Sequence, residues 1–567
     1  MTFFKELNAL ESRFKLSSIL TVSFFAILSF LYVIYVFAQN ADVFFESQFL
    51  HLPFLRNLVN NTLTPEGFFT VYGEHMFPGY NLILGVNYYL FGIWGGFDSW
   101  VYALTLWITT AILIYKFYQT TPEAPLKRNM AAACAALIAL STNHNPQWGM
   151  ALAAAIGVTM FVAAAAILDT ALCRDNRRTL PIFFVLVPLS IVLFLGGYAI
   201  GSIAGLFTII LMWIIQYKTL NRLTVESILV IILSLLVYIF ITSLYGSLLV
   251  NRPNSFGLNL IEIAQFGILM VGSSLIGRAF FEMTGQFWPF YLSGVVLIFW
   301  TIQLWCAFAL FPARGKAFVV SLSAYSIVNI AVVAIFRYRN GADGAFGQWY
   351  MVHTQFISIS VLYYLWTTLS ESKPITSALK IISIILIIIG AMAGYYADWR
   401  KAPYFKLWKE KFAQQAPILL GFPERIQDRN NIFQTMLWPY NEAKASIDFI
   451  YDNKLWEFKS TLPITAGVTS DGWITPDSAT TIVCPSGSQQ VKFTIVRPEN
   501  WPPAVISILS DGQQKLLQVK NEDISIRFSK QPSVLMLDGS DESKSVPMSP
   551  PHDQRKLIGI ISAISCE

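Results

Sequence analysis

The sequence predicts a mainly α-helical, polytopic membrane protein that ends in a small β-sandwich domain outside the membrane. Hydrophobic residues make up 55% of the 567 residues and charged residues only 13%, a balance typical of membrane proteins. Apolar runs long enough to cross a bilayer recur up to residue 397. Short alternating runs separated by Gly, Ser-Asp-Gly and Pro turns follow from residue 456, which is typical of an all-β domain.

The first apolar run, Leu16 to Gln39, is too long for the apolar core of a signal peptide, so we expect an uncleaved first span. The basic loops that follow decide the orientation, because Lys and Arg of short loops stay in the cytoplasm. They all face inside only if the short, Gly-rich run Gly79 to Gly96 lies at the outer interface and does not span. We therefore predict a cytoplasmic N-terminus and an external C-terminus.

About eleven helical spans follow from this choice. They are expected near residues 17–39, 99–118, 129–142, 149–172, 179–197, 200–217, 223–246, 287–311, 317–336, 353–370 and 379–397. Two long outer loops result, at 40–98 and 247–286, with a shorter one at 337–352. The apolar run Leu258 to Gly277 is expected at the interface, because a further span would move the basic loop Arg314 to Lys316 outside.

Three domains are expected on this basis. Residues 1–397 form the transmembrane domain, and residues 398–455, with aromatic residues at helical spacing, form an external linker of amphipathic helices. Residues 456–567 form the external β-sandwich. Cys484 and Cys566 both lie in this tail, where they either pair in an oxidising compartment or remain two free thiols.

Several function classes lack their motifs in this chain. No phosphate-binding Walker loop, dinucleotide fingerprint, HExxH motif or zinc-type cysteine spacing is present, so we expect neither a metal nor a cofactor. The net charge of +5 is small and spread over short clusters, which disfavours nucleic acid as a partner. The remaining possibilities are reactions that use a lipid-linked substrate or a substrate that itself drives the reaction.

Titratable side chains gather between Asn40 and Tyr80, next to the first span. Charged groups are costly to hold at a membrane face, so such a cluster indicates a functional site. Transfer of a sugar from a polyprenyl phosphate needs one carboxylate as base and cations for the phosphate. Asp42 is the expected base, and Glu46 follows it by one helical turn. Glu74 is expected to position the acceptor or the base, and His75 to bind the donor phosphate.

Three arginines outside this loop are candidate phosphate ligands, because the guanidinium fork matches phosphate oxygens. Arg337 and Arg339 stand where the ninth span emerges, and Arg278 lies in the second long outer loop. Asp343, within a Gly-rich turn, is the expected contact to sugar hydroxyls. The alternative for each arginine is binding to lipid headgroups at the interface.

The motif Glu74-His75-Met76-Phe77-Pro78-Gly79-Tyr80, with the apolar run 87–92 after it, resembles the GT-C superfamily of polyprenyl-phosphate-sugar glycosyltransferases. Members of this type carry Glu-His-Arg, so Met76 replaces an arginine, and its task would fall to Arg337 or Arg339. Residues 436–440, 447–456 and 553–559 also resemble the linker and jelly-roll tail of such proteins. The resemblance implies a GT-C-like transmembrane fold with Asp42 as catalytic base.

These observations favour an inverting glycosyltransferase of a bacterial inner membrane. It would move a sugar from a polyprenyl-phosphate carrier to a cell-envelope glycan or glycolipid, such as the O-antigen of lipopolysaccharide, at the periplasmic face. One alternative is an O-antigen polymerase or ligase. Another is a transporter or flippase of lipid-linked glycans, which the uncharged central parts of the spans disfavour.

Overall fold

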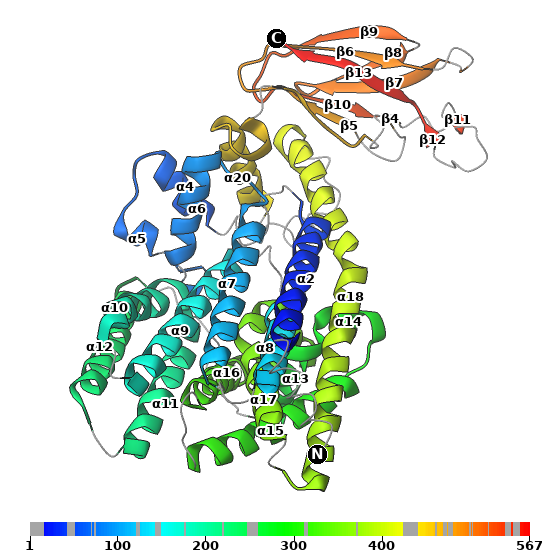
Figure 1. Cartoon of the computed structure of the whole chain (residues 1–567). Coiled ribbons are helices and arrows are strands. Elements are labelled where there is room, and N and C mark those ends of the chain that lie inside the picture. Colours follow the sequence, from blue (N-terminus) through cyan, green and yellow to red (C-terminus); the bar gives the residue numbers. More distant parts are fainter. Residues whose placement is uncertain are drawn as a thin grey trace. The chain divides into compact units, whose positions relative to one another are not determined.

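The structure is a computed structural model of the whole chain (Figure 1). It describes residues 16–41, 51–69, 71–72, 75–76, 78–120, 125–141, 149–174, 177–217, 220–245, 259–310, 316–369, 372–422, 440–459, 462–468, 473–474, 480–497, 501, 503–519, 521–538, 546–547 and 556–567. These residues are mainly helical, with all the longer strands near the C-terminus. This confirms the predicted fold class of a mainly helical chain with a C-terminal β region.

The chain divides into two compact units. The helical unit comprises Met1–Asn40, Asn61–Ile83 and Phe97–Phe405. The second unit comprises Ala41–Asn60, Leu84–Gly96 and Lys406–Glu567. Segments of the first outer loop therefore belong to both units.

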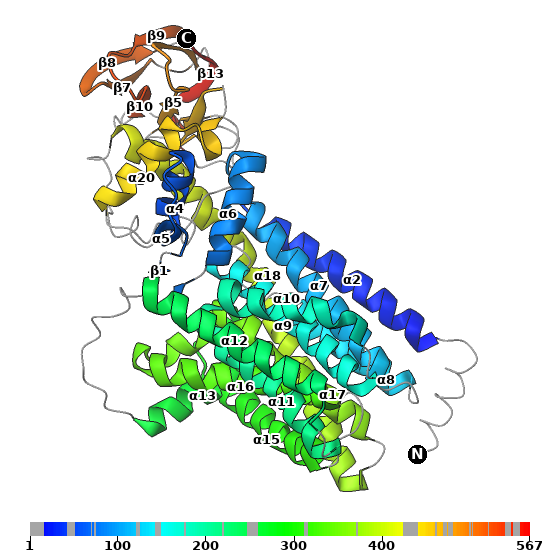
Figure 2. The same cartoon turned by 90° about the vertical axis from the view of Figure 1, so that its left-hand side faces the viewer.

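The helical unit is built mainly from apolar helices, the last of which, α18, continues beyond this unit (Figures 1 and 2). They are α2 (Leu16–Gln39), α7 (Phe97–Thr120), α8 (Pro125–Ala139), α9 (Gly149–Arg174), α10 (Leu180–Pro188), α11 (Ala199–Tyr217), α12 (Arg222–Tyr245), α13 (Leu260–Ile276), α14 (Arg278–Thr284), α15 (Trp288–Leu310), α16 (Lys316–Arg337), α17 (Met351–Thr368) and α18 (Pro374–Gly421).

Every one of the eleven expected spans coincides with one of these helices, but fewer of them qualify as spans. Among the described residues, eight helices are long and apolar enough to cross a membrane, or nine if the bent pair α13–α14 counts as one. The three that do not qualify are α8, α10 and α17. Helix α8 is short, and α10 gives way after Pro188 to a π-helical turn, η2 (Leu189–Phe194).

Helix α17 is the most enclosed of these helices. All its residues from Met351 to Leu365 are buried, although the run includes His353, Gln355 and several hydroxyl side chains. A helix surrounded by protein does not need a lipid-facing apolar surface, and its polar groups find partners on neighbouring helices. The polar residues of α17 thus lower its mean hydropathy, although the helix is buried in the core of the helical unit.

Helices α13 and α14 form a sharply bent pair, with 98° between them. The bend falls at Gly277, whose φ of +79° is a conformation that favours glycine. Gly272, in the preceding turn, lies so close to α15 that a Cβ there would stand 2.0 Å from the Phe290 carbonyl oxygen. The described part of the run predicted to be interfacial, Leu258 to Gly277, is therefore a packed helix that bends by 98° into α14.

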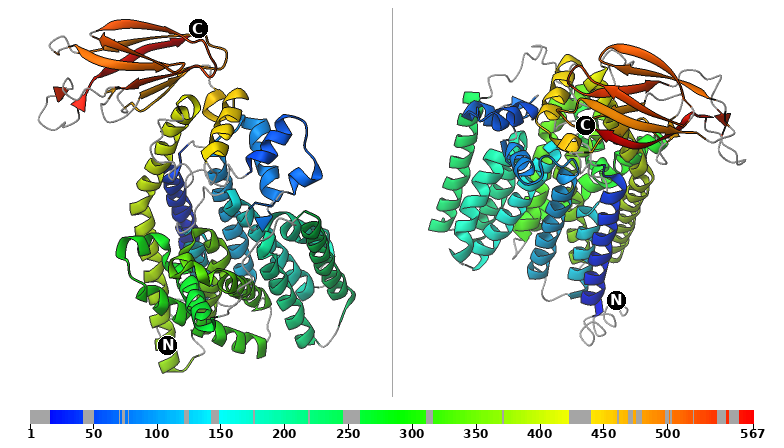
Figure 3. Two further views of the ribbon diagram at one scale, coloured as in Figure 1. Left: turned by 180° about the vertical axis from the view of Figure 1, so that it is seen from behind. Right: turned by 90° about the horizontal axis from the view of Figure 1, so that it is seen from above.

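Most of the C-terminal strands form two antiparallel sheets, while the short strands β11 (Val546–Pro547) and β12 (Lys556–Leu557) pair separately (Figure 3). Five strands make the first sheet in the order β3-β5-β10-β7-β8. These strands are β3 (Ile464–Ala466), β5 (Thr480–Val483), β10 (Val534–Asp538), β7 (Ala504–Ser510) and β8 (Gln513–Val519). The second sheet has the order β4-β13-β6-β9, with β4 (Trp473–Ile474), β13 (Gly559–Cys566), β6 (Gln490–Val496) and β9 (Glu522–Arg527).

One apolar core joins the two sheets and makes the expected sandwich. It contains Ile482, Ile508 and Leu535 from the first sheet and Phe493 and Ile524 from the second. The predicted Ser-Asp-Gly turn closes the β7–β8 hairpin: Asp511 and Gly512 both have positive φ, at 51° and 76°, as a two-residue turn of this kind requires.

Cys484 and Cys566 form a disulfide, which resolves the alternative that the sequence left open. Cys484 follows β5 of one sheet, and Cys566 ends β13 of the other. The bond therefore ties the two sheets together across 82 residues of sequence.

Two α-helices lie in the described part of the region between the spans and the sandwich. Helix α18 runs without interruption through Asp398, where the linker was expected to begin, to Gly421. Helix α20 (Tyr440–Asp452) follows, and within the second unit its Ala445 carbonyl accepts a hydrogen bond of 2.8 Å from Arg56 of α4 (Leu52–Val59).

Candidate functional site

Most of the predicted catalytic residues fall outside the described part of the chain. Asp42, Glu46 and Glu74 belong to this group. His75 is described only as part of β2 (His75–Met76), which pairs with β1 (Val71–Tyr72) in a small hairpin. The roles predicted for these four residues therefore stay predictions, and the structure describes the framework around them.

The hairpin lies against the turn that precedes α11 in the helical unit. Strand β2 contacts η3 (Gly196–Tyr198), the 3-10 turn that precedes α11. Gly79, just after the hairpin, comes so close to η2 that a Cβ there would stand 2.4 Å from the Phe194 ring. The glycine of the Phe-Pro-Gly motif is thus required by close packing.

Three further contacts hold the described part of the first loop within the helical unit. The Phe69 ring stacks on Tyr245 at the end of α12, with 5.4 Å between centroids and 11° between planes. The Asn81 side chain donates a 2.6 Å hydrogen bond to the Phe68 carbonyl. Tyr80 of α6 (Pro78–Phe91) donates its hydroxyl proton to Asp98 in the first turn of α7.

Asp98 is a carboxylate that sequence reasoning missed. It is 1% exposed, and its neighbour Ser99 donates a 3.2 Å hydrogen bond to Asn40, just beyond the end of α2. A carboxylate in the first turn of a helix is stabilised by the helix dipole. An Asp directly before an apolar run, inside the predicted outer loop, was the available signal.

The predicted phosphate ligands Arg337 and Arg339 stand at the end of α16. Arg337 is its last residue, and Arg339 lies in η4 (Tyr338–Asn340), where its Nε donates to the Tyr338 hydroxyl at 3.1 Å. The predicted Gly-rich turn contains a short 3-10 helix, η5 (Ala342–Phe346). Asp343 is exposed on this helix.

The bent pair α13–α14 supports this segment. Ser273 of α13 lies 3.3 Å from the Ala345 carbonyl, to which its hydroxyl donates. The Phe346 ring lies between Phe281 of α14 and Phe290 of α15, with centroid distances of 4.6 and 4.5 Å. The segment that follows the two arginines is therefore packed against α13, α14 and α15.

Arg278 lies in a different setting. Its Nε lies 2.7 Å from Glu282 one turn later on α14, and the same carboxylate lies 3.6 Å from Lys401 of α18. All three side chains are partly exposed, at 44%, 31% and 29%. The geometry gives Arg278 a role in an ion-pair network between α14 and α18, and its predicted contact to phosphate stays a prediction.

An apolar groove of about 450 Å³ lies between α13, α15 and α16. Helix α16 lines it with Ile327, Ile330, Ala331 and Ala334, which follow helical spacing along one face. Arg337 comes one turn after Ala334, so it continues the same face at the end of the groove. The lining of the groove is thus almost wholly apolar, and Arg337 follows its last lining residue on α16 by one helical turn.

A buried aromatic cluster lies beneath the first-loop hairpin. The His353 ring stacks on Tyr198 with centroids 3.8 Å apart, and its Nδ1 lies 2.6 Å from the Tyr325 hydroxyl, within hydrogen-bonding distance. Tyr325 stacks in turn on Phe161 at 4.4 Å. The aromatic partners of His353 lie far from it in sequence, so the sequence alone does not show this cluster.

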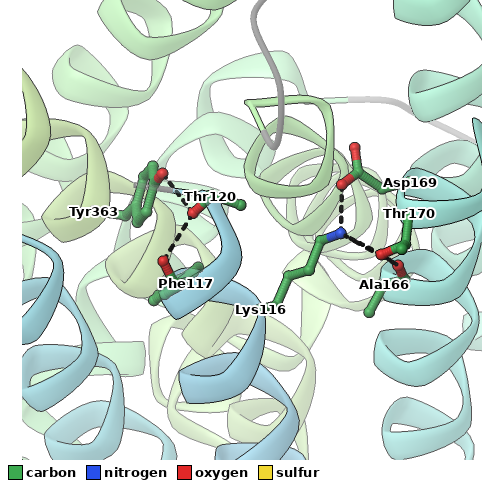
Figure 4. A network of polar contacts seen from close by, with 7 residues as sticks. All are labelled: Lys116, Phe117, Thr120, Ala166, Asp169, Thr170 and Tyr363. Atoms are coloured by element: carbon green, nitrogen blue, oxygen red, sulfur yellow. Dashed lines mark hydrogen bonds and ion pairs between the residues drawn. The ribbon is translucent and has the colours of Figure 1, made fainter. Parts of the chain in front are cut away.

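A second buried polar network lies elsewhere in the helical unit, near the ends of α7 and α9 (Figure 4). Lys116 Nζ lies 2.6 Å from Asp169 Oδ2 and donates a 2.8 Å hydrogen bond to Thr170. Lys116 lies inside the expected span 99–118, and in the structure it is a buried residue of α7. Among the described residues, no group of three or more His, Cys, Asp or Glu could hold a metal ion.

No protein-family model matches the chain, and no curated protein matches it either. Among solved structures, the chain is similar to the crystal structure of ArnT from Cupriavidus metallidurans bound to undecaprenyl phosphate. The TM-score is 0.40 and the identity 12%, over 80% of this chain and 93% of that chain. A score of this size is too low to transfer a fold or an activity, so the resemblance to the GT-C superfamily rests on the chain's own motifs.

Proposed function

We propose that this protein is a membrane glycosyltransferase of the GT-C type that takes a sugar from a polyprenyl-phosphate carrier. The observation that carries the proposal is the apolar groove between α13, α15 and α16, with Arg337 one helical turn beyond its last lining residue on α16. A lipid-linked sugar phosphate has a long apolar chain and one charged headgroup, and this arrangement offers a surface for each. The acceptor is a cell-envelope glycan or glycolipid, and the reaction takes place at the periplasmic face of a bacterial inner membrane.

The groove accepts the prenyl chain next to the headgroup because its lining offers almost no polar group. Thr301 is its only polar side chain, and the Thr301 hydroxyl already donates to the Leu297 carbonyl at 2.7 Å. Arg337, together with Arg339, then holds the phosphate by charge-assisted hydrogen bonds. Asp343 on the same segment contacts the sugar.

The chemical step needs one base and a stabilised leaving group. Asp42 removes the proton from the acceptor hydroxyl, which attacks the anomeric carbon as the bond to the carrier phosphate breaks with inversion. The proton passes to Asp42, and the arginines stabilise the charge on the departing polyprenyl phosphate. Glu74 and His75 orient the acceptor and the donor phosphate from the first-loop hairpin, with Glu46 as a further carboxylate beside Asp42.

The test is to incubate membranes containing the protein with a panel of polyprenyl-phosphate sugars and to follow sugar transfer by mass spectrometry. We expect one donor to be consumed, with a glycosylated envelope component and free polyprenyl phosphate formed together. Polymerised lipid-linked glycan would instead indicate a polymerase or ligase. Movement of an intact lipid-linked glycan across the bilayer without transfer would indicate a flippase. Either result would overturn the proposal.

A further inference from the structure

The strongest unassigned feature of the helical unit is the His353 cluster, because it joins elements that the proposed reaction needs. His353 and Tyr325 are both 0% exposed, and Tyr198 is 8% exposed. Their stacking and hydrogen bonding link η3, α16 and α17 at a single point.

One side of this cluster leads to the first-loop hairpin. Tyr198 is the last residue of η3, and η3 is the turn against which strand β2 lies. The close approach of Gly79 to Phe194 fixes the chain just after the hairpin onto the neighbouring η2 turn. A displacement of Tyr198 would therefore move the surface on which the hairpin carrying His75 rests.

The other side leads to the predicted phosphate site. Tyr325 and Ser326 belong to α16, the helix that ends at Arg337. Ser326 donates a 2.6 Å hydrogen bond to the backbone carbonyl of His353, and Tyr325 is bonded to its ring. Helix α16 is thus held to α17 through both the backbone and the side chain of one residue.

Packing alone does not explain an imidazole at this position. Burying a polar ring costs free energy unless it is hydrogen-bonded, whereas phenylalanine would fill a similar volume without that requirement. A hydrogen bond in a low-dielectric interior fixes the orientation of a ring, which apolar contact does not. The polar ring therefore defines the angle at which Tyr198 is held.

We propose that His353 is a positioning residue that sets the first-loop hairpin relative to α16 and its terminal Arg337, acting through Tyr198 and Tyr325. The proposal rests on the proposed function, in which the hairpin and Arg337 hold the two ends of the reacting group. His353 itself does not touch the substrate. Its effect is on the geometry in which donor and acceptor meet.

The first experiment measures the hairpin directly by hydrogen exchange of the full-length protein in lipid nanodiscs. His353→Phe keeps a stacked ring and removes the hydrogen bond, and Tyr325→Phe removes the same bond from its other end. We expect amides of residues 71–76 to exchange about 2- to 10-fold faster in both variants, the factor that one buried hydrogen bond contributes. The double variant should be no worse than either single one, because both remove the same interaction.

Ser360→Ala is the matched control, since it removes another buried hydrogen bond between the same two helices, from Ser360 to the Val319 carbonyl at 3.0 Å. It should leave the exchange of residues 71–76 unchanged. Unchanged exchange in His353→Phe, or an equal increase in Ser360→Ala, would overturn the positioning role.

The second experiment measures transfer with the donor found for the wild-type protein. Misplacement of reacting groups by about 1 Å can cost about 10²-fold in rate, so kcat/KM should fall by up to that factor in His353→Phe and Tyr325→Phe but not in Ser360→Ala. A wild-type protein without transfer activity would refute the proposed function, while the exchange result would still decide whether His353 positions the hairpin. Full activity in folded His353→Phe would refute the inference alone.

Discussion

Lys116 on α7 and Asp169 on α9 form an ion pair of 2.6 Å in which neither side chain is more than 4% exposed. Removing one partner leaves a buried, unpaired charge, so Lys116→Met should destabilise the protein by about 3–5 kcal/mol. Lys116→Met with Asp169→Leu should recover most of this loss, because neither charge then remains. Thermal unfolding in detergent measures both. Arg222→Met is the control, since it breaks an exposed pair with Glu226 and should change little.

If the double variant is as stable as the wild type but inactive, the pair has a role in function as well as in stability. Loss of stability in the double variant equal to that in Lys116→Met would contradict the expected compensation.

The predicted base is tested by Asp42→Asn, which keeps size and hydrogen bonding but loses basicity. Loss of a general base costs about 10²- to 10⁴-fold in rate, and we expect kcat to fall within this range. Glu74→Gln should have a milder effect if Glu74 only positions a substrate. Normal turnover in inserted, folded Asp42→Asn would remove Asp42 from the mechanism, and an equal loss in Glu74→Gln would make Glu74 the base or its equal partner.

The groove is tested by filling it. A Cβ at Gly267 would lie 3.9 Å from both Ala334 and Ile330, an ordinary contact, so Gly267→Leu can enter the groove without a backbone clash. We expect the donor KM to rise while the melting temperature stays close to that of the wild type. Val295→Leu adds a methylene group to an exposed face of α15 and should not affect KM.

The headgroup end of the same site is tested by Arg337→Ala and Arg339→Ala. Each should raise the donor KM, since the phosphate loses a charge partner near a surface where water screens poorly. Arg278→Ala tests whether Arg278 serves the ion pair with Glu282 or binds phosphate. An effect on stability alone would fit the ion pair, whereas a rise in the donor KM equal to that of the other two variants would make Arg278 a third phosphate ligand.

The disulfide predicts a redox-dependent stability of the sandwich. Replacing both Cys484 and Cys566 by Ser removes a cross-link over 82 residues and should lower the free energy of unfolding of this region by about 2–4 kcal/mol. Thermal unfolding of the oxidised and reduced protein checks it. Reduction should reproduce the effect in the wild type and have none in the Ser variant; a stable, unchanged reduced protein would contradict the prediction.

Orientation is tested by single-cysteine labelling in intact cells. Cysteines at Glu66 and Ser510 should react with a membrane-impermeant reagent from outside, and one at Thr121 only after permeabilisation, because the positive loops are predicted to be cytoplasmic. Labelling of position 121 from outside would mean that Gly79 to Gly96 crosses the membrane.

The sequence determined the class of protein, the location of the helices and the sandwich, because these depend on local composition and periodicity. The apolar runs gave the long helices, and Ser510 to Gly512 gave the tight turn between β7 and β8, since both signals are confined to neighbouring residues. The pairing of Cys484 with Cys566 was only one of two possibilities, because the sequence does not tell how far apart two cysteines lie in the folded protein.

The tertiary structure alone decided which polar residues meet inside the helical unit. Lys116 and Asp169 lie in separate apolar runs, and His353 meets Tyr198 and Tyr325 from two other helices. Likewise, the bend at Gly277 and the groove beside Ala334 depend on how α13, α15 and α16 pack. Helix packing decides which side chains of different helices come close enough to interact. The same pattern of apolar residues on each helix is compatible with many arrangements of the helices, so the sequence pattern does not choose among them.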